Sequence, residues 1–66
     1  MILAEKIMKL RKQQGWSQEE LAMKLGVSRQ SVSKWESGAS DPSTTSLMAL
    51  AKLFGTTAEE LLKETK

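Results

Sequence analysis

Residues 17–38 read SQEELAMKLGVSRQSVSKWESG and predict two short helices around one tight turn. Ser17 is a favourable N-cap, and Glu20, three residues later, can complete a capping box. Gly26 can adopt the positive φ at which many helices end, and Ser28 can cap the helix that follows. Two short helices joined through a glycine-containing turn form a helix-turn-helix unit, whose second helix can enter a DNA groove.

The second of these helices has an outer face that carries no acidic residue. At about 100° per residue, Val32 and Trp35 point to one side. The opposite arc holds the residues that we expect to read bases: Arg29, Gln30, Ser33 and Lys34. Arginine and lysine donate to guanine and glutamine matches adenine in the major groove, while a small serine allows close approach. An ordinary solvated face would also be polar, but the absence of acids and the capped helix before it favour DNA recognition.

The remaining residues predict three more helices and no strand. Apolar residues recur at helical spacing in two stretches, which contain Leu3, Ile7 and Leu10, and then Leu47, Leu50, Ala51 and Phe54. A last helix would contain Leu61 and Leu62. Ser43 and Gly55 mark the ends of the second stretch, and Thr57 with Glu60 forms a further potential capping box. Trp16 is expected in the core or stapled onto Leu21, because stacking on bases is typical of single-strand readers. We therefore expect an all-α fold, a compact five-helix bundle that forms a single domain over residues 1–66.

Composition excludes several classes of function. The chain has 66 residues, of which 39% are hydrophobic, and it contains no Cys and no His. We therefore expect no disulfide, metal site or cofactor, and no enzyme activity. No apolar run approaches the roughly 20 residues of a membrane span, so a soluble, cytoplasmic protein is expected. Residues 1–38 carry seven bases against four acids, a net +3, whereas residues 39–66 carry three against four, a net −1. This asymmetry gives weak support for a polyanion-binding first half.

The motifs together resemble the helix-turn-helix family of the phage lambda repressor and Cro proteins, also called the xenobiotic-response-element family. The resemblance covers nearly the whole chain and runs through Leu10-Arg11, Ser17-Gln18-Glu19-Glu20-Leu21-Ala22, Leu25-Gly26-Val27-Ser28-Arg29, Trp35-Glu36-Ser37-Gly38, Pro42 and the stretch at 50–55. It implies a lambda repressor-like fold with the helix-turn-helix unit at about residues 17–37. It also implies base contacts from the four residues of the acid-free arc.

The resemblance further implies contacts to DNA phosphates from the start of the first helix of the unit and the end of the second. The matching residues are Ser17, Gln18, Ser28 and Ser37. Helix capping alone would also explain the serines, whereas Gln18, at the first helical position, has no apolar contact to explain it. Arg11 and Glu36 are implied to pair across the domain. The loop at 39–43 carries no cation where several relatives are basic, so we expect a small phosphate footprint and a shallow salt dependence.

These features predict a sequence-specific regulator of transcription, a repressor that binds double-stranded DNA. It would act as a homodimer on a pseudo-palindromic operator, since one recognition helix reads only a few base pairs. Apolar residues around Phe54 and on the last helix are the expected dimer surface. The alternative is a protein-interaction module of the antitoxin or anti-repressor type. An exposed apolar patch on the last helix or at the chain ends would favour that alternative.

Overall fold

The computed structural model describes residues 3–63. This part of the chain contains five α-helices joined by turns and loops, and no strand. They are α1 (Leu3–Gln13), α2 (Gln18–Leu25), α3 (Arg29–Ser37), α4 (Thr44–Phe54) and α5 (Ala58–Leu62). The all-α, five-helix prediction is confirmed. The ends of the proposed domain, residues 1–2 and 64–66, lie outside the described residues.

Side chains close in sequence fix the ends of the helices. The Ser17 hydroxyl accepts from the Glu20 N–H at 3.0 Å, and the Glu20 carboxylate accepts from the Ser17 N–H at 2.9 Å, which completes the predicted capping box. Gly26 ends α2 with φ +71°, a left-handed conformation that residues other than glycine rarely adopt. The second predicted box is only half formed, because the Thr57 hydroxyl accepts from the Glu60 N–H without the reciprocal bond.

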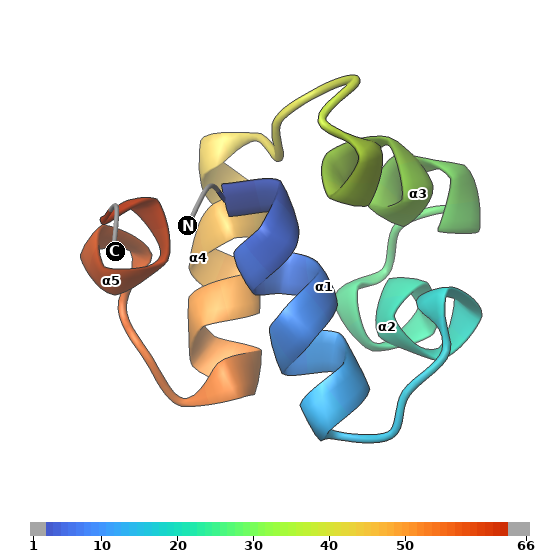
Figure 1. Ribbon diagram of the computed structural model, residues 1–66, viewed down its shortest axis with the longest axis horizontal. Helices are drawn as coiled ribbons and strands as arrows, with labels where there is room; N and C mark the ends of the chain where they lie inside the picture. The colour runs from blue at the N-terminus through green and yellow to red at the C-terminus, as the bar shows by residue number, and fades with distance from the viewer. Residues whose placement is uncertain (1–2, 64–66) are drawn as a thin grey trace.

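The core lies where α1, α2, α3, α4 and α5 converge. Its fully buried side chains are Ile7, Leu21, Val32 and Leu50, with Trp35 and Leu61 almost as well covered. Burial of each such side chain is worth about 1.5–3 kcal/mol. In Figure 1, α1 and α4 form the middle of the molecule, α2 and α3 lie together on one side and α5 lies on the other. The helix-turn-helix unit is thus held against α1 and α4.

Trp16, in the turn before α2, packs onto the end of α4. Its ring stacks on that of Phe54, with centroids 5.9 Å apart and planes inclined by 26°. The Lys24 ammonium lies 4.7 Å from the Trp16 ring centroid, within the range of a cation–π contact. This packing agrees with the interpretation of Trp16 as a core residue. Its ring partner is Phe54 on α4, which is close in space but far away in the sequence.

Candidate nucleic-acid interface

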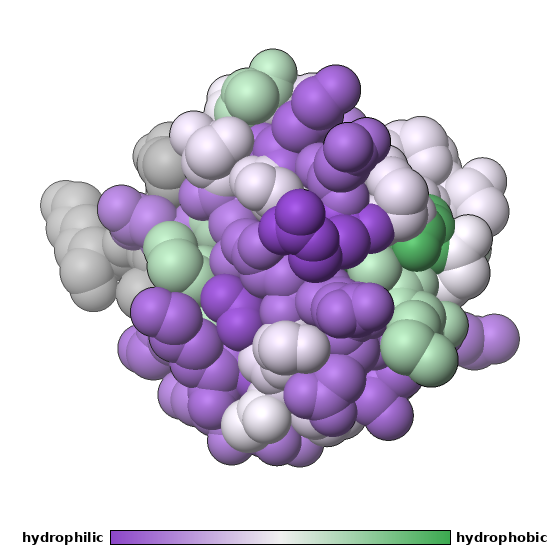
Figure 2. All heavy atoms as spheres, turned by 90° about the vertical axis from the view of Figure 1, so that its right-hand side faces the viewer, coloured by the Kyte–Doolittle hydropathy of each residue, from purple (hydrophilic) through white to green (hydrophobic). Residues whose placement is uncertain are grey.

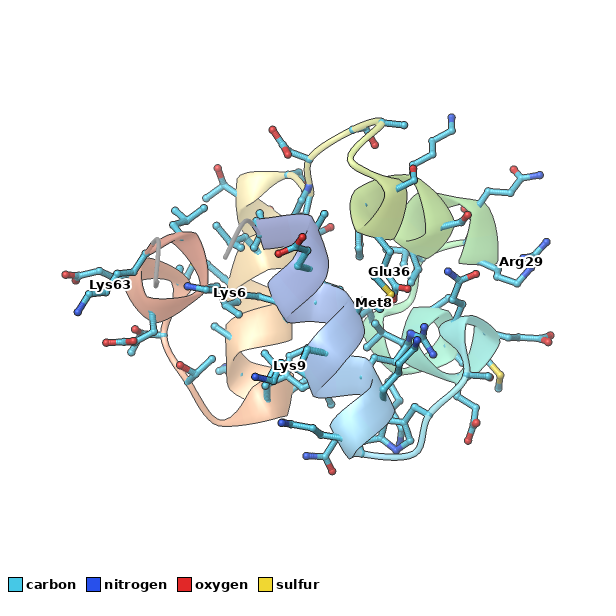
Figure 3. The ribbon with its side chains drawn as sticks, viewed as in Figure 1. Lys6, Met8, Lys9, Arg29, Glu36 and Lys63 are labelled. Atoms are coloured by element: carbon cyan, nitrogen blue, oxygen red, sulfur yellow. The ribbon has the colours of Figure 1, made fainter. Side chains whose placement is uncertain are left out.

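The four residues expected to read bases lie together on the outer side of α3. Arg29, Gln30 and Lys34 are exposed and Ser33 is half-buried, and the four line a shallow hollow of about 370 Å³. They face outward because Val32 and Trp35, on the other side of the helix, are buried in the core. Figure 2 shows this side of the molecule as mainly hydrophilic, and Figure 3 shows Arg29 projecting away from the body.

Glu36, on the buried side of α3, is held by Arg11 at the end of α1. Arg11 Nε donates to one carboxylate oxygen of Glu36 at 2.6 Å, and Nη2 donates to the other at 2.9 Å. Arg11 Nη1 donates to the carbonyl of Trp16 at 2.8 Å. The Arg11 and Glu36 side chains are 11% and 4% exposed. The hydrogen bond to Glu36 raises the pKa of Arg11, against the opposing effect of burial. The predicted pair is therefore formed.

Gln18 also contacts Glu36, a partner that sequence reasoning missed. Its side-chain Nε2 donates, at a distance of 3.1 Å, to the Glu36 oxygen that also accepts from Arg11 Nη2. The sequence excluded only an apolar contact for Gln18, and this polar partner gives the side chain a structural role as well. Gln18 is half-buried at the first position of α2, so a contact with DNA would come from a side chain that already has an intramolecular partner.

The three serines of the expected phosphate set are exposed and all have structural partners. Ser17 and Ser28 cap α2 and α3, since their hydroxyls accept from the N–H groups of the third helical residues. The Ser37 hydroxyl donates to the Lys34 carbonyl at 3.1 Å, at the end of α3. Capping therefore accounts for Ser17 and Ser28, and Ser37 bonds within the last turn of α3. The backbone N–H groups of the first helical turns remain as donors for an anion.

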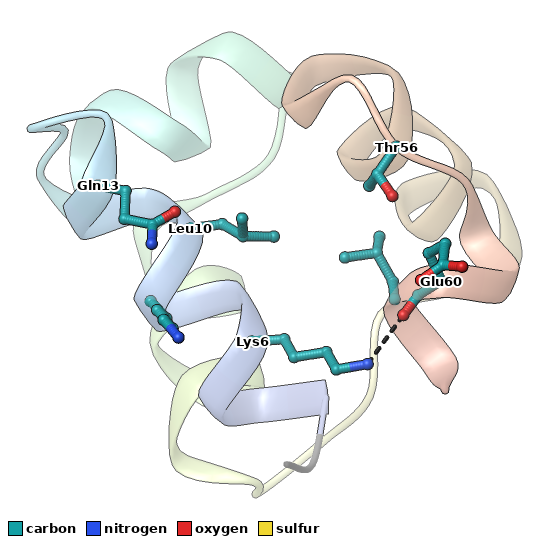
Figure 4. A pocket seen from close by; sticks show the side chains of 7 residues that line it. Lys6, Leu10, Gln13, Thr56 and Glu60 are labelled. Carbon is teal, nitrogen blue, oxygen red and sulfur yellow. Dashed lines mark hydrogen bonds between the residues drawn. The ribbon is translucent and has the colours of Figure 1, made fainter. Parts of the chain in front are cut away.

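Lys6, which sequence reasoning did not single out, joins α1 to the end of α5. Its buried ammonium donates to the carbonyl of Glu60 at 2.8 Å and to the carbonyl of Lys63. Figure 4 shows this side chain crossing to α5 beside a hollow of about 310 Å³, which Leu10 and Leu61 also line. No local signal could reveal the contact, because 54 and 57 residues separate the partners. It places a cation at a helix C-terminus, where cations are favourable.

The large apolar side chains that are exposed lie on three different helices. They are Met23 on α2, Met48 on α4 and Leu62 on α5, with exposed fractions of 77%, 60% and 57%. Leu61, next to Leu62, is buried, so of the two leucines of α5 one lies in the core and the other is exposed. Over residues 3–63, no helix has the length and apolar composition that crossing a membrane requires.

The geometry defines a helix-turn-helix domain: α2 ends in a left-handed glycine, and the outer face of α3 presents two cations and one amide. Residues 7–61 match the family described as "Helix-turn-helix". The chain belongs to that family, which is the one that its motifs resemble.

Known proteins similar to the chain include regulators and their complexes. The HTH-type transcriptional activator BcrR of Enterococcus faecalis is 47% identical over 58 residues, which are 88% of this chain and 28% of BcrR. The P22 c2 repressor in complex with a synthetic operator is 32% identical with a TM-score of 0.90, and 96% of each chain is covered. SinR in complex with DNA is 28% identical with a TM-score of 0.85, covering 94% of this chain and 100% of that one.

Three of the matched regulators are longer proteins. The chain spans 28% of the length of BcrR, and 59% and 53% of two further regulators from Bacillus subtilis. The similarity therefore concerns their helix-turn-helix region.

Proposed function

We propose that the chain is a sequence-specific, double-stranded DNA-binding domain of a transcriptional regulator and that α3 reads the major groove. The observation that carries this proposal is the exposed outer face of α3, where Arg29, Gln30 and Lys34 stand around Ser33 with no acidic side chain among them. These side chains offer donors for guanine and a match for adenine. The similarity to the P22 c2 repressor and SinR, both solved with DNA, supports the same conclusion.

Contacts to the DNA backbone are proposed at the start of α2 and at both ends of α3. The residues concerned are Ser17, Gln18, Ser28 and Ser37. The unpaired N–H groups of a first helical turn suit a phosphate, and polar side chains beside them add donors. Such contacts fix the position of the protein on the duplex and carry no sequence information directly. Loop residues 39–43 add no cation, so few counterions should be released on binding.

We further propose that two copies act together as a homodimer on a pseudo-palindromic operator and repress transcription by covering promoter DNA. Two recognition helices on one face of the duplex require half-sites about one helical turn apart. The proposed dimer surface lies around Phe54 and on α5, where Leu62 is exposed. The P22 c2 repressor supports repression, whereas BcrR is described as an activator. A reporter with the operator inside or upstream of the promoter distinguishes the two effects.

Selection of bound duplexes from a random DNA pool tests the proposal. The expected product is a pseudo-palindrome whose half-sites are about 10 base pairs apart. Arg29→Ala should lose about 1–3 kcal/mol of binding free energy on the selected site and relax preference at one or two positions. Lys9→Ala is the matched control, since Lys9 is an exposed cation on α1, away from Arg29 (Figure 3). Undiminished selectivity in Arg29→Ala would exclude α3 as the reader.

A further inference from the structure

The Glu36 carboxylate is buried and accepts from three N–H groups that come from two other helices. One oxygen accepts from Arg11 Nε, and the other accepts from both Arg11 Nη2 and Gln18 Nε2. The side chain is 4% exposed, and Figure 3 shows Glu36 between α3 and the neighbouring helices. A guanidinium that donates to both oxygens of a carboxylate fixes the orientation of that carboxylate. The Glu36 oxygen that accepts from Gln18 therefore has a fixed position.

The contact also fixes which way the Gln18 amide faces. A side-chain amide has two N–H donors on its nitrogen and one acceptor oxygen. The reversed orientation would place the Gln18 oxygen against a Glu36 oxygen, and two acceptors repel. The nitrogen is therefore turned toward Glu36, which takes only one of its two N–H groups. Within residues 3–63 no acceptor pairs with the second N–H, so it can bind another acceptor. It belongs to the first residue of α2, where the backbone N–H groups of the first turn also lack helical partners.

We propose that Glu36 is a positioning residue for DNA-backbone binding, because it orients the Gln18 amide so that one N–H binds Glu36 and the other binds a DNA phosphate. This inference rests on the proposed function and deepens it. Glu36 itself does not touch DNA. Arg11 balances its negative charge, so the carboxylate can stand near a phosphate without net repulsion. The benefit is preorganisation, since Gln18 loses its rotamer freedom when the protein folds and not when DNA binds.

This arrangement predicts that Gln18 and Glu36 contribute to affinity as one unit. Gln18→Met keeps the length of the side chain and removes both N–H groups. Glu36→Gln keeps the shape of Glu36 and an acceptor for Arg11, but a neutral amide at this position no longer fixes the orientation of the Gln18 amide. Each single variant should weaken binding roughly tenfold, the order expected for one hydrogen bond to a charged group. The double variant should bind no more weakly than the weaker single variant.

The experiment measures dissociation constants by fluorescence anisotropy on the selected operator and on a scrambled duplex of equal length. All variants are assayed at a low temperature at which circular dichroism shows them folded. Both duplexes should lose affinity by the same factor, because phosphate contacts are independent of sequence. Gln13→Met, which changes an exposed glutamine of α1 in the same way, is the control and should change affinity less than about twofold. Multiplicative losses in the double variant would overturn the coupling.

A second measurement needs no variant at Glu36. The two side-chain amide protons of Gln18 give separate NMR signals in the parent protein, and one of them should already be shifted by Glu36. Added duplex should then move mainly the other signal. If neither amide signal responds to DNA that binds, Gln18 does not contact the backbone and the inference fails while the proposed function stands. If the parent protein binds no duplex, both are refuted.

Discussion

Glu36→Ala should destabilise the fold far more than the loss of one surface charge would. The substitution removes the acceptor of three N–H groups, two on Arg11 and one on Gln18. The Arg11 guanidinium, which is 11% exposed in the parent, would then lose its counter-charge. The effect on binding should be secondary to this effect on folding.

The structure sets the size of the effect. Removal of one partner of a buried ion pair costs about 3–5 kcal/mol. The lower value, about 3 kcal/mol, applies here because Arg11 keeps its bond to the Trp16 carbonyl and some access to water. A chain of 66 residues has a total stability of roughly 3–10 kcal/mol. In a domain of this size about 1 kcal/mol moves the midpoint by roughly 4–8 °C, so Tm should fall by roughly 12–24 °C.

Thermal and urea unfolding followed by circular dichroism measure this difference. Asp41→Ala is the matched control, because it removes one carboxylate from an exposed loop residue. Its stability should stay within about 0.5 kcal/mol of the parent. At a temperature at which Glu36→Ala is folded, it should keep the parent's base preference. Any remaining loss of affinity should be equal on all sequences, as the positioning role of Glu36 requires.

A Glu36→Ala protein that melts like Asp41→Ala would refute this reasoning about the buried pair. Normal melting combined with lost base preference would place Glu36 at the interface. The orientation assigned to α3 would then be wrong by about one turn.

Three further substitutions test other parts of the fold. Lys6→Met should cost about 1.5–3 kcal/mol, the range for hydrogen bonds to a charged group, and amide exchange should show faster opening of α5 than of α2. Gly26→Ala should cost about 1–2 kcal/mol in urea unfolding; a Cβ there meets no atom within 4 Å, so the cost comes from φ +71° alone. Arg11→Lys should lose about 1–2 kcal/mol, because an ammonium cannot make the two-point contact with Glu36. Because the pKa of Arg11 is raised in the folded state, the pair stabilises the fold fully at any pH below the pKa of the unfolded arginine. This stabilisation is lost only as the pH rises through the raised pKa. Unfolding free energies measured from pH 7 to about pH 10 should therefore show no loss from this group.

The sequence predicts those parts of the fold that depend on residues a few positions apart. Ser17 and Glu20 interact within one turn, and Gly26 ends α2 through its own backbone conformation. The outward placement of Arg29 and the burial of Trp35 follow from helical periodicity, which needs no knowledge of the neighbouring helices. The helix ends and the identity of the exposed α3 face could therefore be derived before the structure.

Contacts between helices could not be derived in the same way, because they depend on how the helices pack. Periodicity leaves Gln18 outside the core, and only the approach of α3 to the start of α2 gives it Glu36 as a partner. The Arg11–Glu36 pair was anticipated through family resemblance and not from spacing. Lys6 reads in the sequence as a solvated lysine of an amphipathic helix, whereas packing of α5 on α1 buries it.

The contact of Lys6 with the end of α5 has a consequence for how the domain can be joined to other polypeptides. It brings the first helix against the carbonyl of Lys63, at the far end of the described chain. In Figure 1, the end of α5 lies on the side of the molecule opposite α3. A fluorescent protein or affinity tag fused after α5 would therefore emerge behind the domain and leave the outer face of α3 uncovered. A fusion inserted in the loop after α3 would instead stand beside that face.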